Sequence, residues 1–185
     1  MIATQILRQP NLVRTVRATH LPQGMTLLLE VAVGDAEAIT QAERLTGRPP
    51  AMLVDAASFF VEQVLFTERA SHYRVLGAHR DISPADLRYH MTLLMRWVHP
   101  DITFTRPNGQ VDRTVFITRV TAAWQLLKNP ERRQAYDATL DNIQAVPGAA
   151  PPAGLRSARR SKLALRPIKR DGLIGRLFFF LQGRR

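Results

Sequence analysis

Residues 83–101 read SPADLRYHMTLLMRWVHPD, and they carry the strongest structural signals of the chain. It opens with the signals of a helix start: Ser83 can accept a backbone N–H bond as N-cap, Pro84 suits the first helical position, and Asp86 complements the helix dipole. The residues that follow at helical spacing form one apolar face, made of Leu87, Met91, Leu94, Met95 and Val98. Because Pro100 disfavours helical geometry in the residue before it, the helix is predicted to end near Val98 or His99.

A second helix is predicted from about residue 113 to residue 127, where the apolar positions are Phe116, Val120, Ala123, Trp124 and Leu127. The segment between the two helices contains Pro107-Asn108-Gly109, which is a turn signal. Two antiparallel helices joined by this loop would leave His99, Pro100 and Asp101 at one end of the pair. Proline limits backbone freedom there, so the imidazole and the carboxylate are presented at low entropic cost. A carboxylate held in this way suits a bidentate contact with an arginine of another protein, so the tripeptide predicts a recognition loop.

Two short segments flank the helical pair. Before it, Tyr73, Val75 and Leu76 form an aromatic-aliphatic segment that ends at Gly77. After it, Asn129-Pro130 breaks the second helix, and residues 131–140, which contain Tyr136-Asp137, can form a further short helix.

In this order of blocks, residues 72–140 resemble a J-domain, the domain of DnaJ-type co-chaperones. The matching residues are Tyr73-Arg74-Val75-Leu76-Gly77, Leu87, Leu94, His99-Pro100-Asp101, the core positions of the second helix, and Pro130, Arg133, Tyr136 and Asp137. The resemblance implies a loop that docks on a DnaK-type chaperone ATPase and stimulates its ATP hydrolysis. The chaperone-binding residues would be His99, Pro100, Asp101, Arg88 and Arg96. A J-domain catalyses nothing itself, so we expect no enzyme activity, no cofactor and no bound metal. The alternative is a J-like scaffold or adaptor without ATPase stimulation.

One departure from the family concerns the helix that precedes the tripeptide, which usually carries a strongly basic face. Arg88 and Arg96 keep two of the basic positions. Other positions where lysine or arginine is common hold Tyr89, Thr92, Leu93 and Trp97. Fewer charges predict a slower and less salt-sensitive encounter with the chaperone. No Gly/Phe-rich segment or cysteine-rich zinc module follows, so we expect the flanking regions to provide specificity.

The region before the J-domain divides into two parts. Residues 1–23 are polar, basic and interrupted by two prolines, which predicts an irregular lead. Residues 24–68 predict a helical region, because two apolar stretches flank Gly47-Arg48-Pro49-Pro50 and Asp35 is placed to cap a helix. This pattern indicates a helical hairpin that is packed against the next domain or tethered to it. The run 26–33 could instead form a strand.

The J-domain is predicted to span residues 70–141, followed by an Ala/Pro/Gly linker over residues 142–154 and a basic amphipathic tail over residues 155–185. The tail holds ten basic residues and one acidic residue, whereas the other 154 residues carry a net charge of only +2. We expect it to bind an anionic surface through Arg159, Arg160, Lys162, Lys169, Arg170 and Arg176. An interfacial, non-spanning helix on an anionic membrane is the favoured interpretation. Nucleic acid is a less favoured partner, and the tail could also dock on a protein or be disordered.

The composition of the whole chain excludes several classes of protein. A chain of 185 residues with 45% hydrophobic residues and a net charge of +11 allows one ordinary domain, or two small ones with a tail. Cysteine is absent, which excludes disulfides, thiolate catalysis and cysteine-ligated zinc. No apolar run approaches the roughly 18 to 20 residues that cross a bilayer. A secretory signal is not expected, while an organelle transit peptide stays open. We therefore expect an all-α, cytoplasmic protein, with peripheral association at the inner face of a membrane through its tail.

Overall fold

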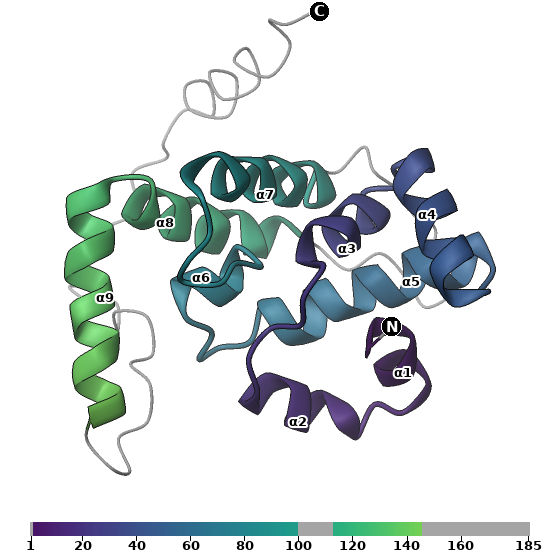
Figure 1. The fold of residues 1–185 in the computed structure, drawn as a ribbon, viewed down its shortest axis with the longest axis horizontal. Helices are drawn as coiled ribbons and strands as arrows, with labels where there is room; N and C mark the ends of the chain where they lie inside the picture. Colours follow the sequence, from purple (N-terminus) through teal and green to yellow (C-terminus); the bar gives the residue numbers. More distant parts are fainter. Residues whose placement is uncertain (1, 100–112, 146–185) are drawn as a thin grey trace, which may run out of the picture. The chain divides into compact units, whose positions relative to one another are not determined.

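The computed structural model describes residues 2–99 and 113–145 (Figure 1). Within these ranges every regular element is helical, which confirms the all-α fold class. The first elements are α1 (Ile2–Arg8), α2 (Leu12–Ala18), α3 (Met25–Ala32), α4 (Ala36–Thr46), α5 (Pro50–Phe60) and its π-helical continuation η1 (Val61–Leu65). After them come α6 (His72–Val75), α7 (Pro84–Trp97), the 3-10 turn η2 (Arg113–Phe116), α8 (Ile117–Leu127) and α9 (Pro130–Ala145).

The prediction of an irregular lead over residues 1–23 is wrong, because α1 and α2 lie there. Both helices bury their apolar residues, among them Ile6 and Val16. Helix α1 packs against α5, and α2 packs against η1. A helix of two turns is unstable in isolation, and its two or three apolar positions are too few to show a helical periodicity in the sequence. Its stability comes from the helices on which it packs, which the local sequence does not reveal.

The predicted helical region before the J-domain contains α3, α4 and α5. The run that could have formed a strand is helical, and α3 buries Met25, Leu28, Leu29, Val31 and Ala32. Helix α4 begins where the sequence predicts, with the side chain of Asp35 accepting a hydrogen bond from the Ala38 backbone N–H at 3.0 Å. It ends at Gly47, whose φ of 62° is a left-handed conformation that glycine adopts at little cost. Helix α5 packs against α1, α3 and α4 and is the central helix of this region.

The second half of the structure is built on α7 and α8, which pack against each other, while α6 and α9 both pack on α8 (Figure 1). Helix α7 ends at Trp97 with Val98 as its C-cap, as predicted from the position of Pro100. Leu87, Leu94, Val120, Ala123 and Leu127 are buried, as their spacing predicts. These side chains belong to the same hydrophobic core cluster as those of α1 to α5. The N-terminal helices are therefore packed against the J-domain region and not merely tethered to it.

Candidate functional site

Helix α7 carries the candidate site, and its first turn is firmly closed. The backbone N–H of Asp86 donates to Ser83 Oγ at 3.1 Å, and Ser83 Oγ donates in turn to Asp86 Oδ2 at 2.7 Å. Pro84 occupies the first turn, where its missing N–H has no consequence. These local interactions fix the residue at which α7 begins. The position of residues 97–99, at the other end of the helix, is thereby defined as well.

Two faces of α7 are covered. Leu87 and Leu94 form one buried face, whereas Leu93 and Trp97 are buried about a third of a turn away. Trp97 Nε1 donates to Ser58 Oγ of α5 at 3.3 Å, so the second buried face is covered by the N-terminal helices. Leu93 and Trp97, which occupy positions where lysine or arginine is common in the family, are thus buried in this chain. In the described residues these two positions are an internal interface.

A buried histidine joins the same two regions. His90 Nδ1 lies 3.2 Å from the backbone oxygen of Leu76, and its Nε2 lies 2.9 Å from Thr26 Oγ1 of α3. A carbonyl only accepts, so Nδ1 carries the proton and Nε2 accepts from the threonine hydroxyl. Burial lowers the pKa of His90 below its ordinary value, opposed in part by the Leu76 carbonyl. The neutral imidazole is thus a polar link between α3 and α7.

Two arginine side chains of the J-domain region also bind the N-terminal region. Each donates hydrogen bonds to backbone carbonyls at the end of a helix. Arg74 of α6 donates to the backbone oxygens of Val16 and Thr19 at the end of α2. Arg119 of α8 donates to those of Phe66 and Thr67, just after η1. A guanidinium at a helix C-terminus satisfies orphan carbonyls and complements the negative end of the dipole.

The exposed part of α7 includes a row of side chains that runs toward the end of the helix. Arg88 and Arg96 are exposed, and Thr92 and His99 are partly exposed. Their spacing of four, four and three residues places them along one side of the helix. The backbone N–H of His99 still donates to the carbonyl of Arg96 at 3.1 Å, which continues the helical turn beyond the cap. We call Arg88, Thr92, Arg96 and His99 the docking stripe. It brings together three of the predicted chaperone-binding residues.

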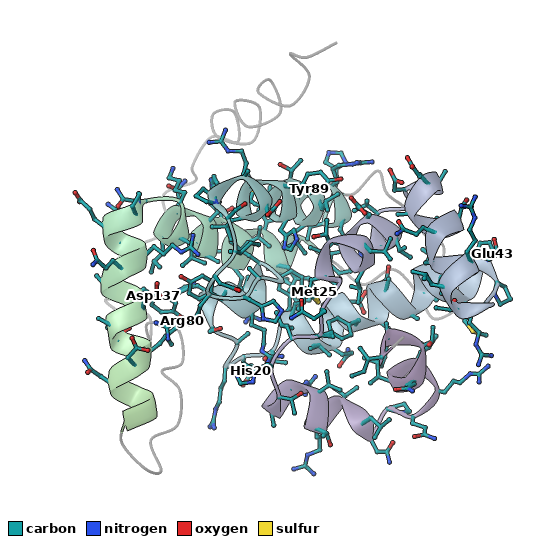
Figure 2. All side chains as sticks on the ribbon, in the orientation of Figure 1. His20, Met25, Glu43, Arg80, Tyr89 and Asp137 are labelled. Carbon is teal, nitrogen blue, oxygen red and sulfur yellow. The ribbon has the colours of Figure 1, made fainter. Side chains whose placement is uncertain are left out.

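Tyr89 and Glu30 form one edge of the docking stripe. The Tyr89 hydroxyl donates to Glu30 Oε1 of α3 at 2.8 Å, and the tyrosine is 43% exposed. Figure 2 labels Tyr89 on α7. The hydrogen bond to Glu30 raises the pKa of Tyr89, with further contributions from burial and from the charges of Glu30 and Asp35, and Arg96 opposes them. Sequence reasoning missed Glu30. A signal was present, since Glu30 is the only charged residue in the apolar stretch 25–32 and such a residue must face outward.

The other end of the J-domain region is closed by a polar network between α9 and the segments before α7. Tyr73 Oη donates to Asp137 Oδ1 at 2.8 Å and accepts from Arg133 Nε at 2.9 Å. Arg80 pairs with Asp141 at 2.5 Å and with Asp137 at 3.5 Å, and Figure 2 labels Arg80 and Asp137 where α9 meets the segment before α7. This network explains why the sequence needs Tyr73, Arg133 and Asp137 in distant segments.

Several predicted site residues lie outside the described residues. They are Pro100, Asp101 and the tail residues Arg159, Arg160, Lys162, Lys169, Arg170 and Arg176. Among the described residues no group of three or more histidine, aspartate or glutamate side chains could hold a metal ion. A search of the same residues found no helix long and apolar enough to span a membrane.

The comparisons with known proteins agree with this geometry. The model of the DnaJ domain family matches residues 71–137. The Curved DNA-binding protein of Coxiella burnetii (strain RSA 493 / Nine Mile phase I) is 31% identical over 105 residues, which is 57% of this chain and 32% of the relative. The Chaperone protein DnaJ of Leifsonia xyli subsp. xyli is 34% identical over 68 residues, 37% of this chain and 17% of the relative. That of Latilactobacillus sakei is 34% identical over 70 residues, 38% of this chain and 17% of the relative.

The chain thus spans a third or less of the length of these curated relatives. No solved structure was found to match it. Residues 71–137 of this chain are therefore a DnaJ domain. The resemblance stated from the sequence is confirmed.

Proposed function

We propose that this chain is a co-chaperone that docks on a DnaK-type ATPase and stimulates its ATP hydrolysis. Docking would use the docking stripe and the loop His99-Pro100-Asp101. The match of residues 71–137 to the DnaJ domain supports this proposal, as do the relatives named Chaperone protein DnaJ. ATP hydrolysis takes place in the partner, so the chain itself needs no catalytic residue, cofactor or metal.

One observation carries the proposal: α7 has a row of side chains that holds the two exposed guanidiniums of Arg88 and Arg96 and ends at the partly exposed His99. Exposed cations mainly accelerate the encounter with an acidic partner surface, and they contribute less to the lifetime of the complex. A rigid helix that ends at a recognition loop presents that loop at a defined angle. The geometry therefore suits a brief, oriented contact with an acidic protein surface.

The test is single-turnover ATP hydrolysis by a purified DnaK-type chaperone in the presence of the full chain. Asp101→Asn is expected to abolish stimulation, because an amide cannot make the charge-assisted, bidentate contact of a carboxylate. Arg96→Gln is expected to weaken half-maximal stimulation by about two- to fivefold at low salt. Arg132→Gln, which removes an exposed arginine of α9, is the matched control and is expected to have no effect. Full stimulation by Asp101→Asn would refute the proposal. An inactive wild-type chain would favour the scaffold alternative.

A second candidate function is the binding of an anionic surface by the tail, residues 155–185. The similarity to a protein named Curved DNA-binding protein favours nucleic acid as that surface. In the tail, arginines flank apolar residues, and this pattern favours an anionic membrane instead. Duplex DNA retention and liposome flotation, each with and without residues 155–185, separate these two partners. Retention on DNA without liposome association would rule out the membrane.

A further inference from the structure

Helix α3 contributes a carboxylate to the surface around the docking stripe. Glu30 is partly buried, and its Oε1 accepts the hydrogen bond from Tyr89 on α7. The hydrogen bond spans 59 positions of sequence, so it exists only because the N-terminal helices pack on α7. A glutamate held by a hydrogen bond loses little further freedom when a partner approaches, and its charge stays in one place.

The charges at this edge oppose those of the docking stripe. Tyr89 lies seven residues before Arg96, two helical turns away on the same side of α7. The carboxylate of Glu30 lies at the Tyr89 hydroxyl, which is 2.8 Å from Oε1, and Tyr89 borders the docking stripe on the same helix. The partner thus meets a positive row with a negative border at Tyr89, where Glu30 is held. Like charges that face each other across an interface slow the encounter and weaken the complex.

Building on the function proposed above, we propose that Glu30 is a specificity-determining residue of the docking surface. Its carboxylate, held by Tyr89 at the edge of the docking stripe, repels an acidic surface of the chaperone ATPase and keeps the affinity of the docking stripe low. The N-terminal helices thereby set the strength of chaperone docking as well as supporting the J-domain fold. The partner that fits this surface is a DnaK-type ATPase with carboxylates opposite Arg88 and Arg96.

The experiment compares two charge-removing variants of the full chain. Glu30→Gln removes the carboxylate at the stripe and keeps a hydrogen-bond acceptor for Tyr89. Glu43→Gln is the matched control, since Glu43 is exposed on α4 and lies apart from Tyr89 (Figure 2). Both variants change the net charge by the same amount, so a difference between them reports position and not total charge.

The readout is the concentration of the chain that gives half-maximal single-turnover ATP hydrolysis by the purified chaperone, at low and at high salt. Glu30→Gln is expected to lower this concentration by about two- to threefold at low salt, the effect of one pair of unit charges roughly 8 Å apart in water. The gain is expected to shrink at high salt, because screening weakens exposed charges. Glu43→Gln is expected to match the wild type. Tyr89→Phe, which frees the carboxylate, is expected to give a smaller gain than Glu30→Gln.

Three outcomes overturn the inference. If Glu30→Gln behaves as Glu43→Gln does, the border has no role, and the proposed function stands without it. If Glu30→Gln weakens docking, or if its gain persists at high salt, the carboxylate acts through the fold and not through its charge. A wild-type chain that fails to stimulate the chaperone overturns the proposed function and this inference together.

Discussion

Replacement of Trp97 tests whether the N-terminal helices and the J-domain form one folded unit. Trp97 is 1% exposed, and its indole donates to Ser58 Oγ, which is equally buried. Its ring lies 5.9 Å from the ring of Phe66 and 6.2 Å from that of Phe116, measured between centroids. The side chain is therefore packed between α5, the segment after η1 and the turn that precedes α8.

The size of the effect follows from these contacts. Truncation of a buried tryptophan to alanine lowers the free energy of unfolding by about 3 to 5 kcal/mol. Loss of the donor to the buried Ser58 hydroxyl adds about 1 kcal/mol. Trp97→Phe keeps an aromatic ring against Phe66 and Phe116 and loses the hydrogen bond, so it is expected to cost only about 1 to 2 kcal/mol. For a domain with a total stability of about 5 to 15 kcal/mol, Trp97→Ala is close to the limit of folding.

The assay is urea unfolding of the full chain, followed by far-ultraviolet circular dichroism. The control is Val115→Ala, because Val115 is 60% exposed and its truncation is expected to change the free energy of unfolding by less than about 0.5 kcal/mol. A loss below about 1 kcal/mol for Trp97→Ala would contradict this prediction, since the two regions would then not be joined through this side chain in solution. If Trp97→Phe and Trp97→Ala lowered the free energy of unfolding equally, the packing of an aromatic ring against Phe66 and Phe116 would contribute less than expected.

Two further predictions concern α7. Burial lowers the pKa of His90, so the unfolded chain takes up a proton at a higher pH than the folded chain does. The free energy of unfolding is therefore expected to decrease from about pH 7 to about pH 5. His90→Gln is expected to reduce this pH dependence, measured by urea unfolding at both pH values. An unchanged slope in the variant would contradict this assignment. Ser83→Ala removes the N-cap hydrogen bond to Asp86 and is expected to cost about 1 kcal/mol, visible as a lower Tm. A Tm equal to that of the wild type would mean that Pro84 alone starts the helix.

The parts of the fold that were predictable are those encoded by local signals. Helix α7 begins and ends where Ser83, Pro84 and Pro100 require, because capping and the restrictions of proline act within one turn. The start of α4 at Asp35 follows from the same kind of signal. The order of blocks around His99 was sufficient to indicate the J-domain, since each block lies in a short contiguous segment.

The parts that were not predictable depend on contacts between distant segments. The periodicity of α7 shows which residues are apolar, but not that the face of Leu93 and Trp97 is covered by α5 and its neighbours. The same limit applies to Glu30, whose position beside Tyr89 results from the packing of α3 on α7. Helices α1 and α2 were not predicted, because each is only seven residues long. In all three cases tertiary packing decides what the local pattern leaves open.

The covered face of α7 has a consequence for how this J-domain can be handled. A chain shortened to start near residue 70 would leave Leu93 and Trp97 bare and His90 without Thr26. Such a fragment is expected to expose an apolar surface and to self-associate. The same is expected when the fragment is fused to another protein. J-domain swaps, in which one co-chaperone receives the domain of another, would here have to transfer residues 2–145 as a single cassette.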